Sequence, residues 1–205
     1  MEVLIANKSH VKYAEIICET IAESAAVRGT GIARRSPEYI TKKLENGNAV
    51  IALEGDKFAG FCYIELWGHG KFVANSGLIV HPDYRNVGLA KKIKHKIFKH
   101  SRTKFPDAKV FSITTGLAVM KMNSDLGYKP VPFSELTDDQ TFWDGCQTCR
   151  NYDVLTRTNR KMCLCTGMLY DPKAKLEKQK KVKDKVFNRL KHIKETMFLK
   201  KKDQK

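Results

Sequence analysis

The sequence predicts an α/β (α+β) protein with a central mixed sheet and helices on both faces. Short apolar runs of strand length alternate with longer stretches whose apolar residues recur at helical spacing. In residues 77–90, GLIVHPDYRNVGLA, a buried strand ends at a His-Pro pair, and a glycine-bearing turn leads into a helix. The other elements are arranged around this strand–turn–helix unit.

The N-terminal region contains one strand and two helices. Residues 3–6 form an apolar run of strand length. Ser9 is placed to cap a helix from His10 to about Ala26. Residues 36–38, Ser-Pro-Glu, combine a capping hydroxyl, a proline and an acid in the first turn, which predicts a second helix ending near Gly47.

Three strands are predicted before the glycine turn. Residues 49–53 and 58–67 form two of them, and the turn at 55–57, Gly-Asp-Lys, joins these two into a hairpin. Residues 72–80 form the third strand, which runs into the turn and is followed by a basic helix up to Lys104.

The second half begins with a strand over residues 109–115 and a helix from Gly116 to Leu126, which Gly127 ends. Residues 137–140 match a capping box before Phe142 and Trp143. Residues 162–170 predict a final strand. We therefore expect a core over 1–135, a cysteine-containing extension over 136–172 that completes the domain, and a Lys-rich amphipathic helical tail over 173–205.

Composition indicates a globular chain with a basic tail. The 205 residues carry a net charge of +16, but residues 173–205 hold 13 Lys and one Arg against four acids. Most of the charge therefore belongs to the tail. No apolar run reaches membrane-spanning length, and the N-terminus lacks the pattern of a signal peptide. Six cysteines without a secretory signal predict reduced thiols and a cytoplasmic location.

The glycine turn predicts an anion-binding site. The first N–H groups of a helix have no partner within the helix, and the helix dipole favours negative charge there. Gly88 removes the side chain that would block a phosphate, and Ala90 keeps the next turn small. Arg85, Lys91 and Lys92 add positive charge.

These residues resemble the acyl-CoA-binding motif of the GNAT acetyltransferase superfamily, Arg/Gln-x-x-Gly-x-Gly/Ala after a strand ending in V-x-P-x-Y-R. The strand FSITT at 111–115 and the LGY at 126–128 extend the resemblance over roughly residues 1–135. It implies a GNAT fold with a mostly antiparallel twisted sheet, N-acetyltransferase activity, and acetyl-CoA or a close acyl-CoA as cosubstrate. The cofactor-binding residues it implies are Leu78, Ile79, Val80, Arg85, Asn86, Val87, Gly88, Leu89, Ala90, Lys91 and Asn123.

The reaction that the resemblance implies is attack of a neutral amine on a thioester through an oxyanion, which an N–H of Ile79 or Val80 would stabilise. Many relatives place a tyrosine five residues before the aromatic of the LGY motif, to protonate the leaving thiolate. Here these positions are Asn123 and Tyr128, and asparagine donates a hydrogen bond but no proton. The candidate bases are Glu65, His69 and His81, acting directly or through water. For each of them a solvated or structural role is the alternative.

Arginines mark the acceptor end. In this fold the loop between the first two helices usually lies over the acceptor pocket, and Arg28, Arg34 and Arg35 lie in or beside it. A guanidinium suits a carboxylate, and Ser112, Thr114 and Thr115 are candidates to supply hydroxyls from a neighbouring strand. Surface arginines on a flexible loop are the alternative.

A finer resemblance concerns a bacterial GNAT subgroup associated with arginine biosynthesis, through RGTGIAxR, GLAVMKMN and CLCTGMLYDP. It implies a small acidic acceptor such as glutamate. The alternatives are acylation of a protein or another amine, and a non-catalytic module that binds CoA or nucleic acid.

The cysteines allow two interpretations. Cys146, Cys149, Cys163 and Cys165 have a spacing that can close a tetrahedral zinc site, although one residue separates the second pair where two or more are typical. The alternative is that they are packing thiols.

The basic tail also allows two interpretations. An apolar stripe, Val182, Val186, Leu190, Ile193 and Met197, follows it at helical spacing. It predicts contact with nucleic acid, an anionic membrane or a partner, or else packing on its own body or on a second copy as a homodimer. Packing is favoured because no aromatics alternate with the lysines.

Overall fold

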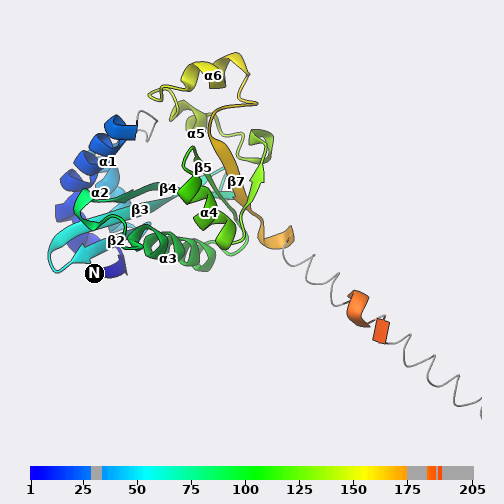
Figure 1. Cartoon of the computed structure of the whole chain (residues 1–205), viewed down its shortest axis with the longest axis horizontal. Coiled ribbons are helices and arrows are strands. Elements are labelled where there is room, and N and C mark those ends of the chain that lie inside the picture. Colours follow the sequence, from blue (N-terminus) through cyan, green and yellow to red (C-terminus); the bar gives the residue numbers. More distant parts are fainter. Residues whose placement is uncertain (29–33, 175–183, 188, 191–205) are drawn as a thin grey trace, which may run out of the picture. The chain divides into compact units, whose positions relative to one another are not determined.

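A seven-stranded sheet forms the centre of the structure, a computed structural model that describes residues 1–28, 34–174, 184–187 and 189–190 (Figure 1). The strand order is β1-β2-β3-β4-β5-β7-β6. The strands are β1 (Glu2–Ile5), β2 (Ala49–Glu54), β3 (Lys57–Trp67), β4 (Phe72–Val80), β5 (Lys109–Thr114), β6 (Lys129–Val131) and β7 (Thr166–Tyr170).

The helices connect these strands. They are α1 (Ala14–Arg28), α2 (Pro37–Glu45), α3 (Leu89–Lys104), α4 (Leu117–Asp125), α5 (Gln140–Asp144) and α6 (Tyr152–Arg157), with short 3₁₀ segments η1 (Lys8–Tyr13), η2 (Pro82–Tyr84) and η3 (Phe133–Glu135). The chain divides into two compact units, Met1–Tyr170 and Asp171–Lys205. Most of the predicted tail, with Val182, Ile193 and Met197 of its stripe, lies outside the described residues.

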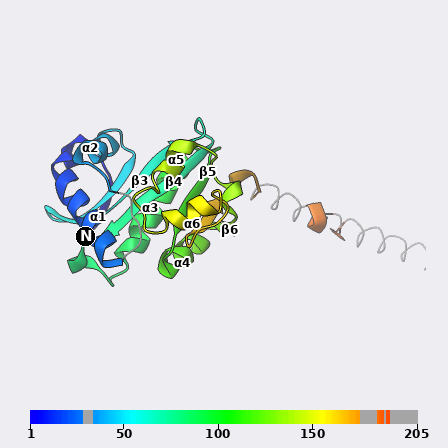
Figure 2. The same ribbon diagram turned by 90° about the horizontal axis from the view of Figure 1, so that it is seen from above.

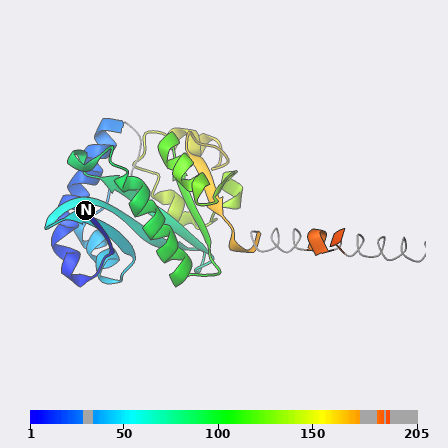
Figure 3. The same ribbon diagram turned by 60° about the horizontal axis from the view of Figure 1, so that its bottom comes forward.

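Helices cover both faces of the sheet because successive side chains of a strand point to opposite faces. On one face, α1 and α2 pack against β2 and β3 through residues such as Ile17, Ile40 and Phe61. On the other, α3 crosses the strands (Figure 3), with Ile93 and Ile97 in the core. The prediction of a mixed sheet with helices on both faces is confirmed.

A third apolar cluster joins the C-terminal part of the first unit to the sheet. Phe133, Trp143 and Leu155 pack against Phe111 of β5 and Leu169 of β7. Figure 2 shows α5 and α6 on the side of the molecule that carries β5 and β6, away from α1 and α2. The cysteine-containing segment therefore forms part of the same packed unit as the glycine turn.

The sheet separates in its middle. The β4–β5 pair is parallel, and its register joins only residues 72–74 to residues 109–111. The other neighbouring strands pair antiparallel, so the sheet is mixed and mostly antiparallel, as predicted. Beyond Ala74 and Phe111 the two strands continue unpaired with each other, which leaves a gap in the sheet.

Four details differ from the predictions. Asn7, not Ser9, caps the first helical segment, which begins as the 3₁₀ turn η1. Asp139, not Thr137, caps α5 by accepting from the Thr141 N–H. The last strand begins at Thr166, because residues 162–165 form irregular chain and a bend. The three-residue β6 and the helix α6 are too short to give a clear periodicity. Within the described ranges, no helix is long and apolar enough to cross a membrane.

Candidate active site

A cleft opens where β4 and β5 separate, with a cavity volume of about 570 Å³. β3, β4 and β5 supply side chains to its walls, as do α2, α3, α4 and residues 133–165. The volume suits a small molecule or the reactive end of a larger one. The parting of two parallel strands therefore creates the site.

A bulge shapes the β4 wall. Tyr63 of β3 pairs with Ser76, whereas Phe61 pairs with Ile79, so β4 contains an extra residue between these pairs. Gly77 lies in this bulge with φ +64°, and a Cβ there would come 2.5 Å from the Tyr63 ring. Only glycine therefore fits under this ring.

The three β4 residues predicted to bind the cofactor, Leu78, Ile79 and Val80, differ in where their side chains lie. The Leu78 side chain lines the cleft. The side chains of Ile79 and Val80 are buried in the two cores on opposite faces of the sheet. Their backbone groups lie on the stretch of β4 that no longer pairs with β5. The assignment of an oxyanion donor among them stays a prediction.

The glycine turn leaves backbone donors free. Gly88 is the N-cap of α3 with φ +77°, Asn86 also has a positive φ, and a Cβ at Gly88 would meet only open space. Within the described residues, the N–H groups of Val87, Gly88 and Leu89 have no hydrogen-bond acceptor. This arrangement provides converging donors at a helix N-terminus, as an anion site requires.

Two of the three cations predicted beside this turn, Arg85 and Lys91, have partners within the protein, and Lys92 is exposed. The Arg85 guanidinium donates to the Val80 carbonyl at 3.1 Å and to the Ser24 hydroxyl at 3.1 Å, which ties the turn to β4 and α1. Lys91 forms an exposed ion pair with Asp125 at 3.3 Å. Arg85 therefore holds the turn in shape.

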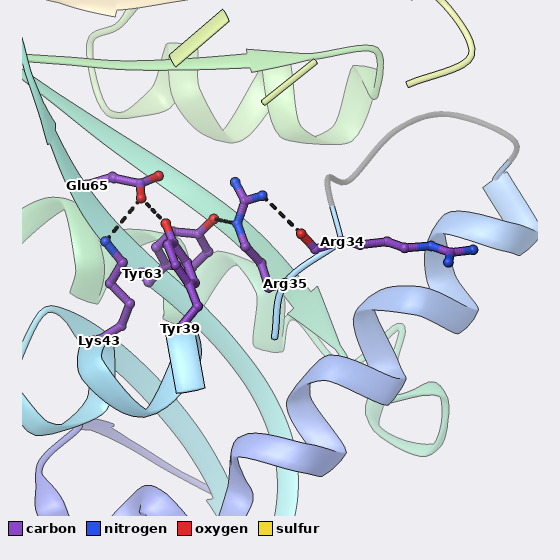
Figure 4. Close-up of polar contacts among 6 residues, drawn as sticks. All are labelled: Arg34, Arg35, Tyr39, Lys43, Tyr63 and Glu65. Carbon is purple, nitrogen blue, oxygen red and sulfur yellow. Dashed lines mark hydrogen bonds and ion pairs between the residues drawn. The ribbon is translucent and has the colours of Figure 1, made fainter. Parts of the chain in front are cut away.

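A polar cluster lies on the opposite side of the cleft from α3, on the face that α2 covers (Figure 4). Glu65 of β3 accepts hydrogen bonds from the Tyr39 hydroxyl and, at 3.1 Å, from the Lys43 ammonium. Tyr39 and Lys43 are one turn apart on α2, so they present their polar groups to the same carboxylate. The Glu65 side chain is 12% exposed and that of Lys43 is 18% exposed.

Arg35 completes this cluster. Its Nε donates to the Tyr63 hydroxyl at 2.9 Å, and its Nη1 donates to the Arg34 carbonyl at 3.1 Å. No described residue accepts from its Nη2. Figure 4 shows the guanidinium beside the two tyrosines, whereas the Arg34 side chain points away. Arg35 therefore lines the cleft with one donor edge unused.

Burial shifts the proton affinities of this cluster. Burial raises the pKa of Glu65 to about 7, against the opposing effect of Arg35. Burial and the nearby Arg35 lower the pKa of Lys43 to about 8. A carboxylate with a pKa near 7 is matched to accepting a proton at neutral pH.

The remaining predicted residues divide between the cleft and its surroundings. Thr114 and Thr115 line the cleft. Arg28 ends α1, and its side chain, like residues 29–33 of the loop, lies outside the described part. His81 accepts from the Asp83 N–H in the turn before α3, and His69 is exposed between β3 and β4; neither side chain lines the cleft.

Asn123 and Tyr128, the two residues predicted to lie near the leaving thiolate, are both buried. Asn123 is fully buried, donates to the Ser112 hydroxyl at 2.8 Å, and has an Oδ1 without a partner among the described residues. The Tyr128 hydroxyl donates to Asn75 Oδ1 at 3.1 Å, and burial raises its pKa well above the ordinary value. Neither is among the residues that line the cleft, so their catalytic roles stay predictions.

Four cysteines gather on one wall of the cleft. They are Cys146, Cys149, Cys163 and Cys165. Burial and the neighbouring thiols raise the pKa of Cys146 to about 11 and that of Cys165 to about 12. In the described part of the chain, however, no group of three or more His, Cys, Asp or Glu is arranged to hold a metal ion. The arrangement fits half-buried packing thiols and gives no support to a zinc site.

The sequence interpretation missed Tyr39, Tyr63 and Lys94, which line the cleft, and Lys43, which donates to Glu65. A signal exists for three of them. Tyr39 and Lys43 share one face of a well-capped helix, and Tyr63 lies two residues from Glu65 on one strand. Their meeting depends on the packing of α2 against β3, which no local pattern contains.

Comparison with protein families gives an independent result. Residues 16–118 match the model of the family described as acetyltransferase (GNAT) family. This stretch spans α1 to the start of α4, and so includes the bulge, the glycine turn and the opening between β4 and β5. No curated protein sequence matches the chain.

Solved structures share the fold. A Neisseria gonorrhoeae N-acetylglutamate synthase, complexed with coenzyme A and N-acetyl-glutamate, superposes with a TM-score of 0.59 at 14% identity, over 83% of this chain and 34% of that one. This chain thus spans about a third of that synthase. A Mycobacterium tuberculosis protein in complex with CoA gives 0.58 at 15% identity, over 83% and 99% of the two chains. The Salmonella typhimurium protein yncA, with its cofactor acetyl-CoA, gives 0.56 at 15%, over 84% and 94%.

Proposed function

The chain belongs to the GNAT acetyltransferase family, and from this premise we propose that it transfers an acetyl group from acetyl-CoA to the amino group of a small acidic acceptor, such as glutamate. One observation carries the choice of acceptor. Glu65 and the unused donor edge of Arg35 line the same cleft as the unpaired edge of β4. A base and an anion-binding group thus lie where an amino acid would meet a thioester.

The cofactor side of this proposal follows from the backbone. The free N–H groups at the start of α3 would bind the pyrophosphate of acetyl-CoA. The edge of β4 beyond Ala74, which β5 does not pair, would hydrogen-bond the amides of the pantetheine arm. The thioester would then lie in the cleft beside Leu78. Two structures of the same fold hold CoA or acetyl-CoA, which supports the choice of cosubstrate.

The acceptor side follows from charge and size. Arg35 Nη2 would donate to a carboxylate of the acceptor. This charge-assisted bond discriminates strongly against amines that carry no carboxylate. The cleft has a volume of about 570 Å³ and is lined on one side by residues between 141 and 165, which favours a small molecule as the acceptor. A synthase of the same fold is complexed with coenzyme A and N-acetyl-glutamate, which supports an amino-acid acceptor.

Chemically, Glu65 would take the proton that the attacking amine loses as its nitrogen bonds to the carbonyl carbon. The Tyr39 hydroxyl and the Lys43 ammonium both donate to one oxygen of Glu65, so they orient the other oxygen toward the substrate. The tetrahedral oxyanion then collapses, the C–S bond breaks, and its electron pair leaves on sulfur.

The test is thiol release from acetyl-CoA and succinyl-CoA with a panel of amino acids and amines, with mass spectrometry of the product. We expect acetylation of an acidic amino acid and little reaction with its neutral amide. Equal turnover of neutral amines would contradict the assigned acceptor, and silence across the panel would contradict the proposed reaction.

Arg35→Met sharpens this test. Losing a charged hydrogen bond worth about 1.5–3 kcal/mol should raise KM for the acidic acceptor about 10- to 150-fold. The KM for acetyl-CoA should stay within about twofold. Arg157→Met, at an exposed position at the end of α6, is the matched control and should leave both constants unchanged. An unchanged acceptor KM in Arg35→Met would remove Arg35 from the acceptor site.

A further inference from the structure

Lys94 is a buried cation on the helix that follows the glycine turn. It lies on α3 between Ile93 and Ile97, on the face that packs against the sheet, and only 1% of its surface is exposed. The neighbouring lysines of α3, Lys92 and Lys96, are exposed to solvent. A lysine in the apolar face of an amphipathic helix is costly unless its ammonium has a partner.

The described residues supply no anionic partner. Lys94 is absent from every ion pair of the structure's described part. Its Nζ lies 5.0 Å from the centre of the Tyr128 ring, a cation–π contact. Cys62 on β3 is close enough to affect its charge, but burial raises the pKa of this thiol to about 11, so it is neutral at pH 7.

The polar groups around Lys94 are bonded to each other. The Tyr128 hydroxyl donates to Asn75 Oδ1, and Asn75 Nδ2 donates to the Ser101 hydroxyl at 2.8 Å. The Cys62 thiol donates to the Ser76 carbonyl at 3.3 Å. Among these groups, the ammonium of Lys94 is the one without a hydrogen-bond or ion-pair partner in the described part of the chain.

The cleft reaches Lys94 from the side of the unpaired strands. Lys94 lines it together with Asn75, Ser76 and Leu78 of β4 and Ser112 of β5. The glycine turn begins the same helix, so a CoA arm that runs from Gly88 along β4 passes this position. Glu65 and Arg35 lie on the opposite face of the sheet, which separates Lys94 from the acceptor end.

We propose that Lys94 is the catalytic acid of the acetyl transfer: its ammonium contacts the thioester sulfur and protonates the leaving thiolate. When the C–S bond breaks, its electron pair goes to sulfur, and a proton moves from Nζ to sulfur, which gives the free CoA thiol and a neutral amine. Lys94 then regains a proton from water. Asn123 occupies the position of the tyrosine expected from the GNAT resemblance, and it is bonded to Ser112, so this function falls to a different element.

Burial makes the lysine a suitable donor. Its pKa is lowered to about 8, mainly by burial, so it is charged at neutral pH and releases its proton more readily than a solvated lysine. This inference rests on the proposed acetyl transfer, because it needs CoA in the cleft. It does not depend on the identity of the acceptor.

A titration of bound CoA tests the contact without an acceptor. The ultraviolet absorbance of the thiolate is followed against pH for CoA bound to the wild type, Lys94→Met and Lys96→Met, with desulfo-CoA complexes subtracted to remove the protein's own thiols. We expect the pKa of the bound thiol to lie about one unit or more lower in the wild type and Lys96→Met than in Lys94→Met. Equal values in all three proteins would overturn the proposal.

Turnover then tests the proton transfer. With the acceptor identified in the panel, Lys94→Met should lose about 10²-fold in kcat, with the KM for acetyl-CoA changed by less than about threefold. Lys94→Gln, which keeps a polar group, guards against misfolding and should show the same loss. Either variant with kcat within twofold of the wild type would overturn the role.

The two proposals fail in different ways. If the wild type binds CoA and shows the lowered thiol pKa but acetylates no acceptor, only the proposed function fails. If it turns over but Lys94→Met does so equally, only the role of Lys94 fails. If the wild type binds no CoA, both are wrong.

Discussion

The glycine turn and the polar cluster around Glu65 are built in different ways. The glycine turn is a contiguous stretch whose useful groups are backbone N–H donors, and it faces open space. The polar cluster consists of Arg35, which precedes α2, Tyr39 and Lys43 of α2, and Tyr63 and Glu65 of β3. Its useful groups are side chains that are partly or wholly buried.

Because of this difference, we expect the glycine turn and the polar cluster to respond differently to pH. Backbone donors do not titrate, so the anion site should work over a wide pH range. In the polar cluster, burial raises the pKa of the Glu65 carboxyl to about 7 and lowers the pKa of the Lys43 ammonium to about 8. We therefore expect cofactor binding to depend on the shape of the turn, and catalysis to depend on the protonation state of the cluster.

The largest expected effect is on the turn. Gly88→Glu places a carboxylate among the free N–H groups of α3. There it occupies the proposed phosphate site and repels the phosphate. Because charge-assisted hydrogen bonds are worth about 1.5–3 kcal/mol each, the affinity for CoA should fall at least about 10²-fold. Isothermal titration calorimetry with CoA measures this.

Gly55→Glu is the matched control. Gly55 also has a positive φ and open space around its missing Cβ, but it lies in the β2–β3 hairpin. Both variants should pay the same left-handed backbone cost of about 1–2 kcal/mol in stability. If both variants bind CoA equally well, the phosphate site is not at Gly88.

The next effect concerns the cluster. Glu65→Gln removes the base, and we expect kcat/KM at pH 8 to fall about 10²-fold. The ratio of wild-type to Glu65→Gln kcat/KM cancels the titration of the substrate amine. The pKa of Glu65 is raised, so the carboxylate is protonated below about pH 7, and this ratio should fall tenfold per pH unit below that value.

Glu45→Gln, at an exposed position at the end of α2, should track the wild type at every pH. A ratio for Glu65→Gln that stays constant between pH 5 and 8 would mean that Glu65 accepts no proton in the reaction.

The same contrast explains what the sequence could predict. The strands, the helix after the turn and the place of Gly88 at the start of that helix follow from contiguous patterns, and β4 has the predicted bounds, Phe72–Val80. Of the predicted substrate arginines whose side chains are described, Arg35 lines the cleft and Arg34 points away. Spacing cannot separate two adjacent arginines, because the path of the backbone before α2 decides which of them faces inward.

Lys94 shows the other limit of sequence interpretation. Its helix carries a lysine or an arginine at seven of its 16 positions, which is typical of a solvated basic face. Only the register of Ile93 and Ile97 against the sheet shows that one of these cations is buried. The same is true of Glu65, whose raised pKa depends on the cover that α2 and the rest of the fold provide.

The smallest expected effect distinguishes the base from its supports. Tyr39→Phe keeps the ring, and with it the contacts of the ring with the Arg35 and Lys43 cations at 5.1 and 4.7 Å, but removes the hydroxyl that donates to Glu65. That bond stabilises the charged carboxylate, so its loss should raise the pKa of Glu65 further. A net hydrogen bond of about 0.5–1.5 kcal/mol corresponds to a shift of about half to one pH unit.

The measurement is the kcat/KM ratio of Tyr39→Phe to the Tyr39→Phe/Glu65→Gln double variant, against pH. The midpoint of this ratio should lie at higher pH than the midpoint of the wild-type to Glu65→Gln ratio. At alkaline pH the two ratios should agree within about twofold. Tyr13→Phe loses a comparable hydrogen bond, to the Asp56 carbonyl on the β2–β3 turn, and should leave the midpoint unchanged. A lower plateau with an unmoved midpoint would instead make the Tyr39 hydroxyl a direct contact of the substrate, because loss of its hydrogen bond to Glu65 should move the midpoint.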